Sequence, residues 1–256
     1  MAPVIAAWVT ACVGASLDTG DSSVEAVPPV IFVAETGAGR HAWFDSETEE
    51  LLGEQCLDEV FPEACAEPGC HVFGGWSAEA GPVFAYTRLE PERSATVGGV
   101  LTLQPGHPPE VDGALEVLDW VSLLDVAECE GELVPATCRL RMPHDVVRVR
   151  DLWVIADTGN DRLLWVTAEG AVQTVLDATH PDWGDCGWPN HLAVVPEGLL
   201  VTCKGARDGG EATDKGHLAL WDVAEGAEPT RTWRWPSEGS LAAVHGAVVD
   251  LSLIHI

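Results

Sequence analysis

The stretch Leu152-Trp-Val-Ile-Ala-Asp-Thr-Gly-Asn-Asp-Arg-Leu-Leu-Trp165 decides the fold, because most of it occurs twice in the chain. Ile31-Phe-Val-Ala-Glu-Thr-Gly-Ala-Gly-Arg40 aligns without gaps with Trp153–Arg162, and Trp43 and Trp165 keep the same offset. Each copy is a β-prone run, then a turn with glycine, then a second β-prone run that ends near tryptophan. This pattern predicts a β-hairpin.

A looser third copy and several flanking strands extend the repeat. The third copy comprises Leu200–Gly205 and, after an insertion, Gly216–Asp222. Short β-prone runs begin near His144, His191 and His245, at spacings of 47 and 54 residues. Repeats of about 40–50 residues with several strands each are typical of propeller blades, which stack because one sheet cannot bury both of its faces alone.

We therefore predict an all-β chain that forms a β-propeller of four-stranded antiparallel blades. Val30–Leu57 has the pattern of the outer part of a first blade. Three further blade-like patterns cover His71–Leu124, Pro143–Leu176 and Pro189–Trp235, and Leu241 starts another. This amounts to about three and a half blades, fewer than the ~4–8 of a closed propeller. The predicted propeller is thus incomplete and occupies residues 30–250.

The clearest blade resembles the repeat of the NHL-type six-bladed propeller family. The resemblance lies in Pro143-His-Asp-Val146, Leu152–Leu163, Trp165 and Glu169-Gly170. That family contains both enzymes and binding proteins, so the resemblance implies a fold and leaves the function open.

The residues of this motif predict structural roles. Asp157 is expected to accept hydrogen bonds from backbone amides of the turn, and Gly159 to adopt a positive φ. Arg162 is expected to pair with an acid or stack on the next blade. The recurring Trp43, Trp165 and Trp221 are predicted to pack between blades.

The acidic composition of the chain restricts the kinds of molecule that it is expected to bind. Lys and Arg number 13 and Asp and Glu 41, which gives a net charge of −28. Such a chain repels phosphate backbones and anionic lipid, so we expect no nucleic-acid partner. No apolar run reaches the ~18 residues of a membrane span. The expected partner is a protein or a small-molecule ligand, with the membrane reached only through a lipid anchor.

The N-terminal segment 1–12 is apolar and ends in Val9-Thr-Ala-Cys12, which resembles a bacterial lipobox with Cys12 as the lipidated residue. Residues 13–29 are small, polar and end in proline, as expected of a flexible linker. Together they predict an exported bacterial protein, periplasmic or anchored at the outer membrane or cell surface. The alternative is that segment 1–12 is a strand or helix of the domain.

The C-terminal segment Leu251-Ser-Leu-Ile-His-Ile256 matches the translation of a sequencing-adapter end, so we interpret residues 251–256 as a non-native scar. On that interpretation the natural sequence continues beyond Asp250 and this chain is a fragment. The alternative is an ordinary hydrophobic strand.

The cysteines predict disulfides rather than a zinc site, because no CxxC pair occurs. Cys129 and Cys138 flank a short acidic loop, and Cys186 and Cys203 lie within one blade. Two of Cys56, Cys65 and Cys70 form a further candidate pair. A reduced cytosolic protein is the alternative.

Histidines supply the candidate site. His71, His144, His191 and His245 fall near the starts of predicted inner strands, which converge on one mouth of a propeller channel. His144, His191 and His245 are candidate ligands for zinc, or candidate catalytic residues, and Asp145 is a further candidate ligand. Aligning Pro143 with Pro189 places Asn190 opposite His144 and His191 opposite Asp145, so the registers differ. The alternative is a set of hydrogen-bonded channel histidines without metal.

Three enzyme classes resemble this arrangement in part. Peptide-amidating lyases are propellers that hold zinc through axial histidines, which would make His144, His191 and His245 ligands. Lactonase-like propellers hold calcium through channel oxygens, for which Asp145 and Asn190 are suited. Arylsulfotransferase propellers use a channel histidine as nucleophile, but only Arg141 and Arg148 lie near His144 to hold the anion.

Two loops are predicted to be structural. Asp182–Trp188 is acidic and aromatic, and we expect a solvated loop pinned by a disulfide. Lys204–Lys215 is Gly-rich but lacks the spacing of a phosphate-binding loop. Because the strong motifs are structural, the sequence favours a binding scaffold, with a propeller enzyme that has a histidine-lined axial site as the alternative.

Overall fold

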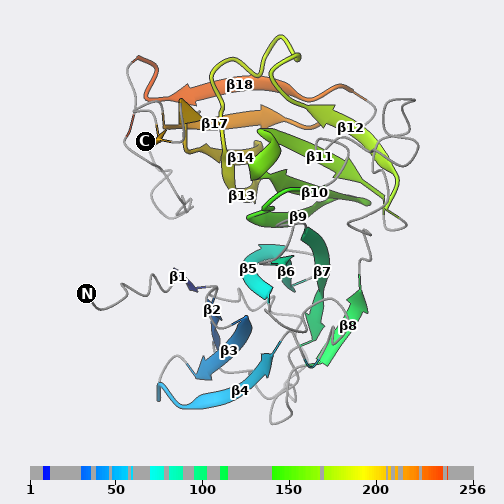
Figure 1. Cartoon of the computed structure of the whole chain (residues 1–256), viewed down its shortest axis with the longest axis vertical. Helices are drawn as coiled ribbons and strands as arrows, with labels where there is room; N and C mark the ends of the chain where they lie inside the picture. The colour runs from blue at the N-terminus through cyan, green and yellow to red at the C-terminus, as the bar shows by residue number, and fades with distance from the viewer. Residues whose placement is uncertain are drawn as a thin grey trace, which may run out of the picture.

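The computed structural model describes residues 8–11, 30–35, 39–45, 48–56, 59, 70–77, 81–88, 95–102, 110–114, 140–167, 170–205, 207–208, 211–212, 216–224, 227–238 and 241. Strands dominate this part of the chain, in four sheets of four strands each and one small ribbon (Figure 1). Within these residues, no helix has the length and apolar character needed to cross a bilayer.

The four large sheets follow one another along the chain, and every neighbouring pair of strands is antiparallel. The first sheet contains β1 (Trp8–Ala11), β2 (Val30–Glu35), β3 (Arg40–Asp45) and β4 (Leu51–Cys56). The second contains β5 (Cys70–Ser77), β6 (Gly81–Arg88), β7 (Ala95–Thr102) and β8 (Glu110–Ala114). The third contains β9 (Asp145–Val149), β10 (Leu152–Asp157), β11 (Arg162–Val166) and β12 (Val172–Leu176).

The fourth sheet repeats the meander with one interruption. It contains β13 (Pro189–Val195), β14 (Gly198–Cys203), β17 (His217–Asp222) and β18 (Thr230–Trp235). Between β14 and β17 lies the ribbon of β15 (Arg207–Asp208) and β16 (Glu211–Ala212), which belongs to the predicted Gly-rich loop. The insertion therefore adds a small hairpin between β14 and β17 and leaves the strand order of the sheet unchanged.

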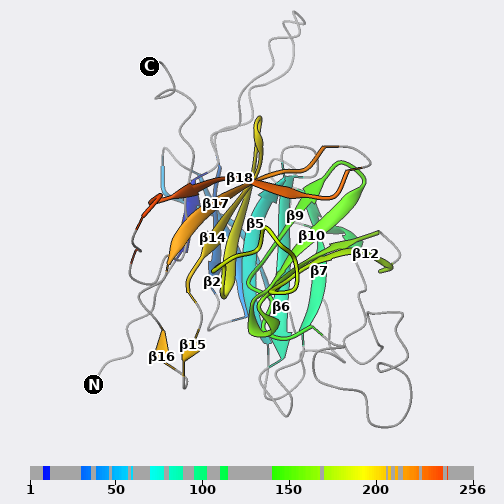
Figure 2. The same cartoon turned by 90° about the horizontal axis from the view of Figure 1, so that it is seen from above.

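Consecutive sheets pack side by side. Strand β5 contacts both β2 and β9, and β9 contacts β13, so strands near the inner edge of each sheet meet those of the next. Figure 2 shows β2, β5 and β9 from above, and in Figure 1 the first and fourth sheets lie at the two ends of the row. This is the arrangement of propeller blades, and it confirms the predicted fold class. The described sheets are four rather than three and a half.

The difference in blade number comes from the N-terminal segment. Trp8–Ala11 pairs with β2, with Trp8 opposite Ala34 and Ala11 opposite Ile31, and supplies the strand missing from the predicted first blade. Cleavage before Cys12 would remove this strand, so β1 and a lipoprotein leader are alternative fates of the same four residues. Export and lipid attachment stay predictions, and Cys12, the linker 13–29 and the segment 251–256 lie outside the described residues.

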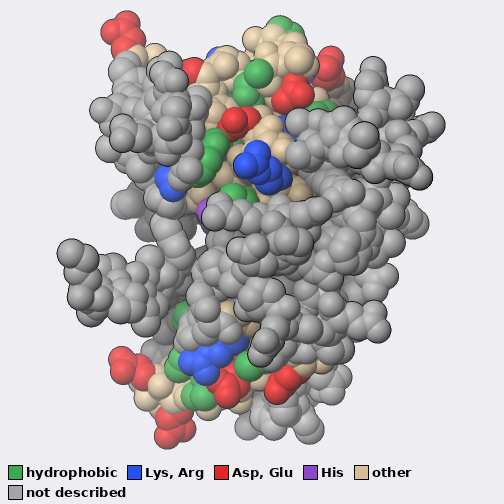
Figure 3. Space-filling model, viewed as in Figure 1, with side chains coloured by type: hydrophobic (Ala, Val, Ile, Leu, Met, Phe, Trp, Pro, Cys, Tyr) green, Lys and Arg blue, Asp and Glu red, His purple; other side chains and the backbone are tan. Residues whose placement is uncertain are grey.

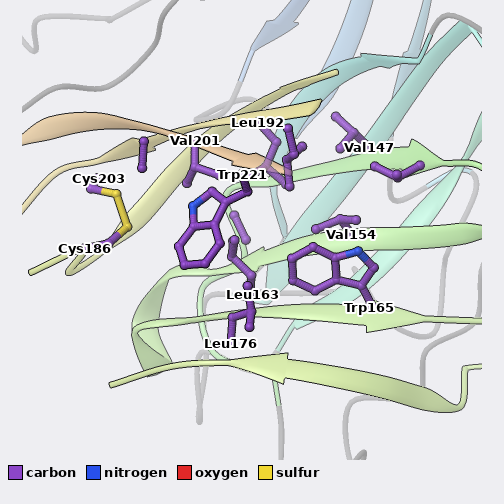
Figure 4. Close-up of a cluster of buried hydrophobic side chains, with 14 of the residues drawn as sticks. Val147, Val154, Leu163, Trp165, Leu176, Cys186, Leu192, Val201, Cys203 and Trp221 are labelled. Carbon is purple, nitrogen blue, oxygen red and sulfur yellow. A yellow bond between two sulfur atoms is a disulfide. The ribbon is translucent and has the colours of Figure 1, made fainter. Parts of the chain in front are cut away.

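A core of buried side chains joins the third and fourth sheets. Trp165 from β11 and Trp221 from β17 are 4% and 0% exposed, and both belong to one apolar cluster that spans the two sheets. Figure 4 shows the two indoles within this cluster and the Cys186–Cys203 disulfide at its edge. Trp43 in the first sheet is also buried. The predicted packing role of the recurring tryptophans is confirmed for the pair between these two sheets.

Candidate functional site between the third and fourth sheets

The Asp157 carboxylate lies at the turn between β10 and β11. It is fully buried, and its Oδ1 accepts a hydrogen bond from the backbone N–H of Arg141 at 2.6 Å. Its Oδ2 accepts from Asn160 Nδ2 at 2.9 Å and from Arg162 Nε at 2.6 Å. Burial raises the pKa of Asp157, while the positive charge of Arg162 and these hydrogen bonds act in the opposite direction. The predicted structural role is confirmed, although the backbone donor precedes β9 instead of lying in the turn.

The prediction that Gly159 adopts a positive φ is wrong. The positive φ of this turn, 54°, belongs to Asp161, whose carboxylate accepts a hydrogen bond from the backbone N–H of Trp188 at 2.6 Å. Gly159 is required for a close approach instead. Its N–H donates to the Arg141 carbonyl at 2.7 Å, and a Cβ at this position would lie 2.5 Å from that oxygen.

We call the junction formed by Arg141, Asp157, Gly159 and Arg162 the corner of the third sheet. The fourth sheet has an equivalent corner with different side chains. Gly205 donates to the Gly187 carbonyl at 2.9 Å, and both residues lie 46 positions beyond Gly159 and Arg141. At the same offset Cys203 takes the place of Asp157. Asp157 pairs with Arg162 across β10 and β11, and Cys203 pairs with His217 across β14 and β17. The two corners are therefore equivalent positions of two copies of one repeat.

Asp145 links the inner strands of the two sheets. Its Oδ1 accepts from the backbone N–H of Val146 at 2.8 Å, and its Oδ2 accepts from the backbone N–H of Leu192 on β13 at 2.8 Å. The same Oδ2 lies 2.7 Å from Nδ1 of His191, and the Asp145 side chain is only 1% exposed. A carboxylate on Nδ1 fixes the tautomer of an imidazole and places its basic lone pair on Nε2. Asp145 thus positions His191, which is 22% exposed.

A second histidine lies beside this pair. His144 Nδ1 and Asn190 Nδ2 lie 2.9 Å apart, which joins the start of β9 to the start of β13. Asn190 is 6% exposed, and the backbone N–H of the next residue, His191, donates a hydrogen bond to Thr202 Oγ1 at 2.9 Å. We call His144, Asp145, Asn190, His191 and Thr202 the inter-sheet polar cluster. It brings together two of the predicted site histidines and Asp145.

The predicted metal ligands do not converge as a set in the described residues. Within that part of the chain, the group of three possible ligands whose atoms lie within 4.8 Å of one another is Cys186, Cys203 and His217. His245 lies outside the described residues, and of His71 only its backbone position in β5 is described. A zinc or calcium ion held by His144, His191, His245 and Asp145 therefore stays a prediction.

The predicted disulfide between Cys186 and Cys203 is confirmed, with the two Cα atoms 4.9 Å apart. It fastens the loop before β13 to the end of β14, so the expectation that Asp182–Trp188 is pinned by a disulfide is also confirmed. The loop is less solvated than expected, because Trp183 is 2% exposed and packs against Trp221. Cys129 and Cys138 lie outside the described residues.

Sequence reasoning missed the surroundings of this disulfide. Buried His217 Nε2 lies 3.6 Å from Asp185 Oδ1, while Asp185 Oδ2 accepts from Arg234 at 2.9 Å. Burial raises the pKa of Asp185, but the hydrogen bond from Arg234 and the positive charges of His217 and Arg234 outweigh burial and lower it. The alignment of Cys203 with Asp157 is the signal that could have found this corner, because the facing position then becomes His217.

Comparisons with known proteins identify no family for this chain. No family model matches the chain, and no curated protein matches it. Among solved structures, a structural-genomics crystal structure of a protein from Lactobacillus plantarum is similar with a TM-score of 0.41 and 11% sequence identity. The similarity covers 80% of this chain and 53% of that one, so this chain spans about half the length of that structure.

Proposed function

We propose that this chain is an exported, NHL-type propeller that serves as a binding module, with ligand contacts at the inter-sheet polar cluster. One observation carries the proposal. The motif side chains Asp157 and Arg162 are buried and bonded to each other, whereas His144 and His191 are only partly buried at the ends of neighbouring inner strands. The scaffold is thus built from the motif, and the histidines are the groups that a ligand can reach.

Charge indicates the kind of ligand. With a net charge of −28, the chain attracts cations and repels anions over distances of about a Debye length, ~8 Å at physiological salt. Figure 3 shows carboxylates at both ends of the described surface on the face in view. We therefore expect a cationic or neutral polar ligand, such as a basic protein segment or an amine, that hydrogen-bonds to imidazole.

A titration followed by NMR tests this site. We expect some members of a panel of small amines and neutral polar compounds to shift the ring signals of His144 and His191. His180, whose Nε2 lies 3.2 Å from Glu228 Oε1, is not part of the cluster, and its ring signals serve as the internal control. Shifts that spare both cluster histidines, or that are equal at His180, would contradict the assignment of the site.

Export is supported by the disulfide, because disulfides persist in oxidising compartments. The lipobox-like Val9–Cys12 supports lipid attachment, which would keep the propeller at a membrane surface. Intact-mass analysis of the protein expressed in a bacterial host tests both statements. A mature chain that begins at an acylated Cys12 supports the anchor, and a chain that retains Trp8 in the soluble fraction contradicts it.

The Asp145–His191 pair favours a second candidate function, an enzyme. A buried carboxylate on Nδ1 makes an imidazole a better general base or metal ligand at Nε2. Lyase-like or lactonase-like chemistry would add zinc or calcium, and arylsulfotransferase-like chemistry would use the histidine as nucleophile. Stoichiometric zinc or calcium in the purified protein that is lost in His144→Ala/His191→Ala supports this candidate. Metal-free protein with unchanged ligand shifts supports the binding module.

A further inference from the structure

We propose that Cys186, Cys203 and His217 form a zinc site when the disulfide is reduced, so that this corner holds either a disulfide or a metal ion. The ligand atoms of the three residues lie within 4.8 Å of one another, and all three residues are fully buried. Two thiolates and an imidazole are the ligands that zinc prefers. The site is separate from the inter-sheet polar cluster and does not depend on the proposed function.

The backbone holds the three residues together without help from the disulfide. Cys203 and His217 are direct cross-strand partners of β14 and β17, a relation that places their Cβ atoms ~4.5–5.5 Å apart. Two backbone hydrogen bonds hold the segment after Cys186. The N–H of Lys204 donates to the Trp188 carbonyl at 3.1 Å, and the N–H of Gly205 donates to the Gly187 carbonyl at 2.9 Å. Reduction breaks one covalent bond and leaves these contacts, so the ligands stay close enough to bind an ion.

Asp185 lies beside the three ligands and is not one of them, because its carboxylate does not fall within 4.8 Å of all three ligand atoms. Its Oδ1 lies 3.6 Å from His217 Nε2. Its other oxygen is held by Arg234, and Arg231 Nη1 lies 3.7 Å from Oδ1. A zinc ion bound by two thiolates and a neutral imidazole carries no net charge, and its fourth position is open to water.

The chemical change is a two-electron reduction followed by metal binding. A dithiol donates two electrons and two protons to the Cys186–Cys203 bond, which becomes two thiols while the dithiol becomes a disulfide. Binding of Zn²⁺ then releases the two thiol protons, and neutral His217 donates a lone pair. In an oxidising compartment the sulfurs stay bonded to each other and the site is closed.

Cobalt(II) titration of the full chain tests the proposal, because Co²⁺ replaces zinc and reports thiolate ligands by absorption. The disulfide is reduced with a phosphine, which takes oxygen from water to become phosphine oxide and yields two thiols, and the phosphine is removed before the metal is added. We expect the reduced protein to bind one tightly held equivalent with thiolate-to-cobalt charge-transfer bands that zinc abolishes. The oxidised protein should show no such bands.

Matched variants separate this site from the other cysteines of the chain. Cys186→Ser/Cys203→Ser should lose the equivalent, whereas Cys129→Ser/Cys138→Ser, which removes the same number of thiols elsewhere, should keep it. His217→Gln can be checked for folding in its oxidised form and should weaken binding about tenfold or more after reduction. The proposal is overturned if the reduced protein binds no cobalt through thiolate, if Cys186→Ser/Cys203→Ser keeps the equivalent, or if His217→Gln binds as tightly as the parent.

Discussion

The third and fourth sheets fasten the same corner by different means. In the third sheet, Asp157 and Arg162 face each other as an ion pair with atoms 2.6 Å apart, buried at 0% and 5% exposure of their side chains. In the fourth sheet, the equivalent positions are Cys203 and His217, and Cys203 is bonded to Cys186. Each corner has the same backbone hydrogen bond, which runs from Gly159 to Arg141 in the third sheet and from Gly205 to Gly187 in the fourth. The repeat therefore keeps a backbone geometry, and the side chains that stabilise it are exchangeable.

The side chains at the two corners suit different roles, one structural and one chemical. The corner of the third sheet has its polar atoms bonded to one another, which suits a structural element. The corner of the fourth sheet contains two sulfurs and an imidazole, groups that react or bind metals once the disulfide opens. Side-chain exchange at an equivalent position thus converts a structural corner into a chemically responsive one.

The largest effect is expected from breaking the buried ion pair. Asp157→Asn leaves the charge of Arg162 buried without its carboxylate, which costs about 3–5 kcal/mol of unfolding free energy. Urea denaturation followed by tryptophan fluorescence measures the loss. A loss below about 1 kcal/mol, the range of exposed pairs, would show that the corner of the third sheet contributes little.

Removing the Cys186–Cys203 disulfide should cause the next largest loss of unfolding free energy. The disulfide spans a sequence separation of 17 residues, for which loop-closure entropy predicts a loss of about 3 kcal/mol in Cys186→Ala/Cys203→Ala. The same denaturation experiment under oxidising conditions measures it. Equal stability of the variant and the parent would mean that the bond adds nothing to the backbone contacts at this corner.

The first sheet, which contains the Ile31–Arg40 copy of the repeat, allows a comparison of how stability depends on pH. Burial lowers the pKa of His41 on β3 from 6.5 to about 3, because the folded state excludes the charged imidazole. The unfolded chain takes up this proton as the pH falls below 6.5. Stability from this group is therefore fully present above pH 6.5 and is lost toward pH 3, by about 2 kcal/mol at pH 5.

Unfolding free energies measured between pH 7 and pH 5 test the role of His41. His41→Gln is the control, since it removes the titrating ring and should flatten the pH dependence. A slope that is the same in the variant and the parent would assign the acid sensitivity to other groups.

The smallest effect is expected at the exposed counterpart of the buried ion pair. Arg40 occupies the place of Arg162 in the first sheet and pairs with Glu54 at 2.5 Å, with side chains 36% and 46% exposed. Glu54→Gln should cost about 0–1 kcal/mol, because solvent screens the pair. A loss equal to that of Asp157→Asn would contradict the view that burial makes the corner of the third sheet strong.

The sequence predicts the fold well because its signal is a periodic backbone pattern. Hairpin runs, glycine turns and recurring tryptophans set the four-stranded meander, and the Pro143 with Pro189 alignment matches the observed equivalence of the third and fourth sheets. The role of Gly159 was missed because a close approach to Arg141 and a positive φ both require glycine, and a sequence does not tell them apart.

The candidate site was predicted only in part. His144, Asp145 and His191 could be placed near the inner strand ends, but their partners depend on contacts between sheets, such as that of Asp145 with Leu192. The corner of the fourth sheet was missed because the insertion between Cys203 and His217 separates two residues that the strand register places opposite each other.

The equivalence of the two corners is the central claim, and a corner exchange tests it most directly. Cys186→Leu/Cys203→Asp/His217→Arg gives the fourth sheet the ion pair of the third. Leucine is chosen at position 186 because the position 46 residues earlier in the third repeat copy is Leu140. This variant is compared with Cys186→Leu/Cys203→Ala/His217→Ala by urea denaturation. We predict that the exchanged corner is more stable than the alanine variant by about 1–3 kcal/mol. An exchanged corner that is no more stable than the alanine variant would contradict the claim that both corners are one position of a repeat.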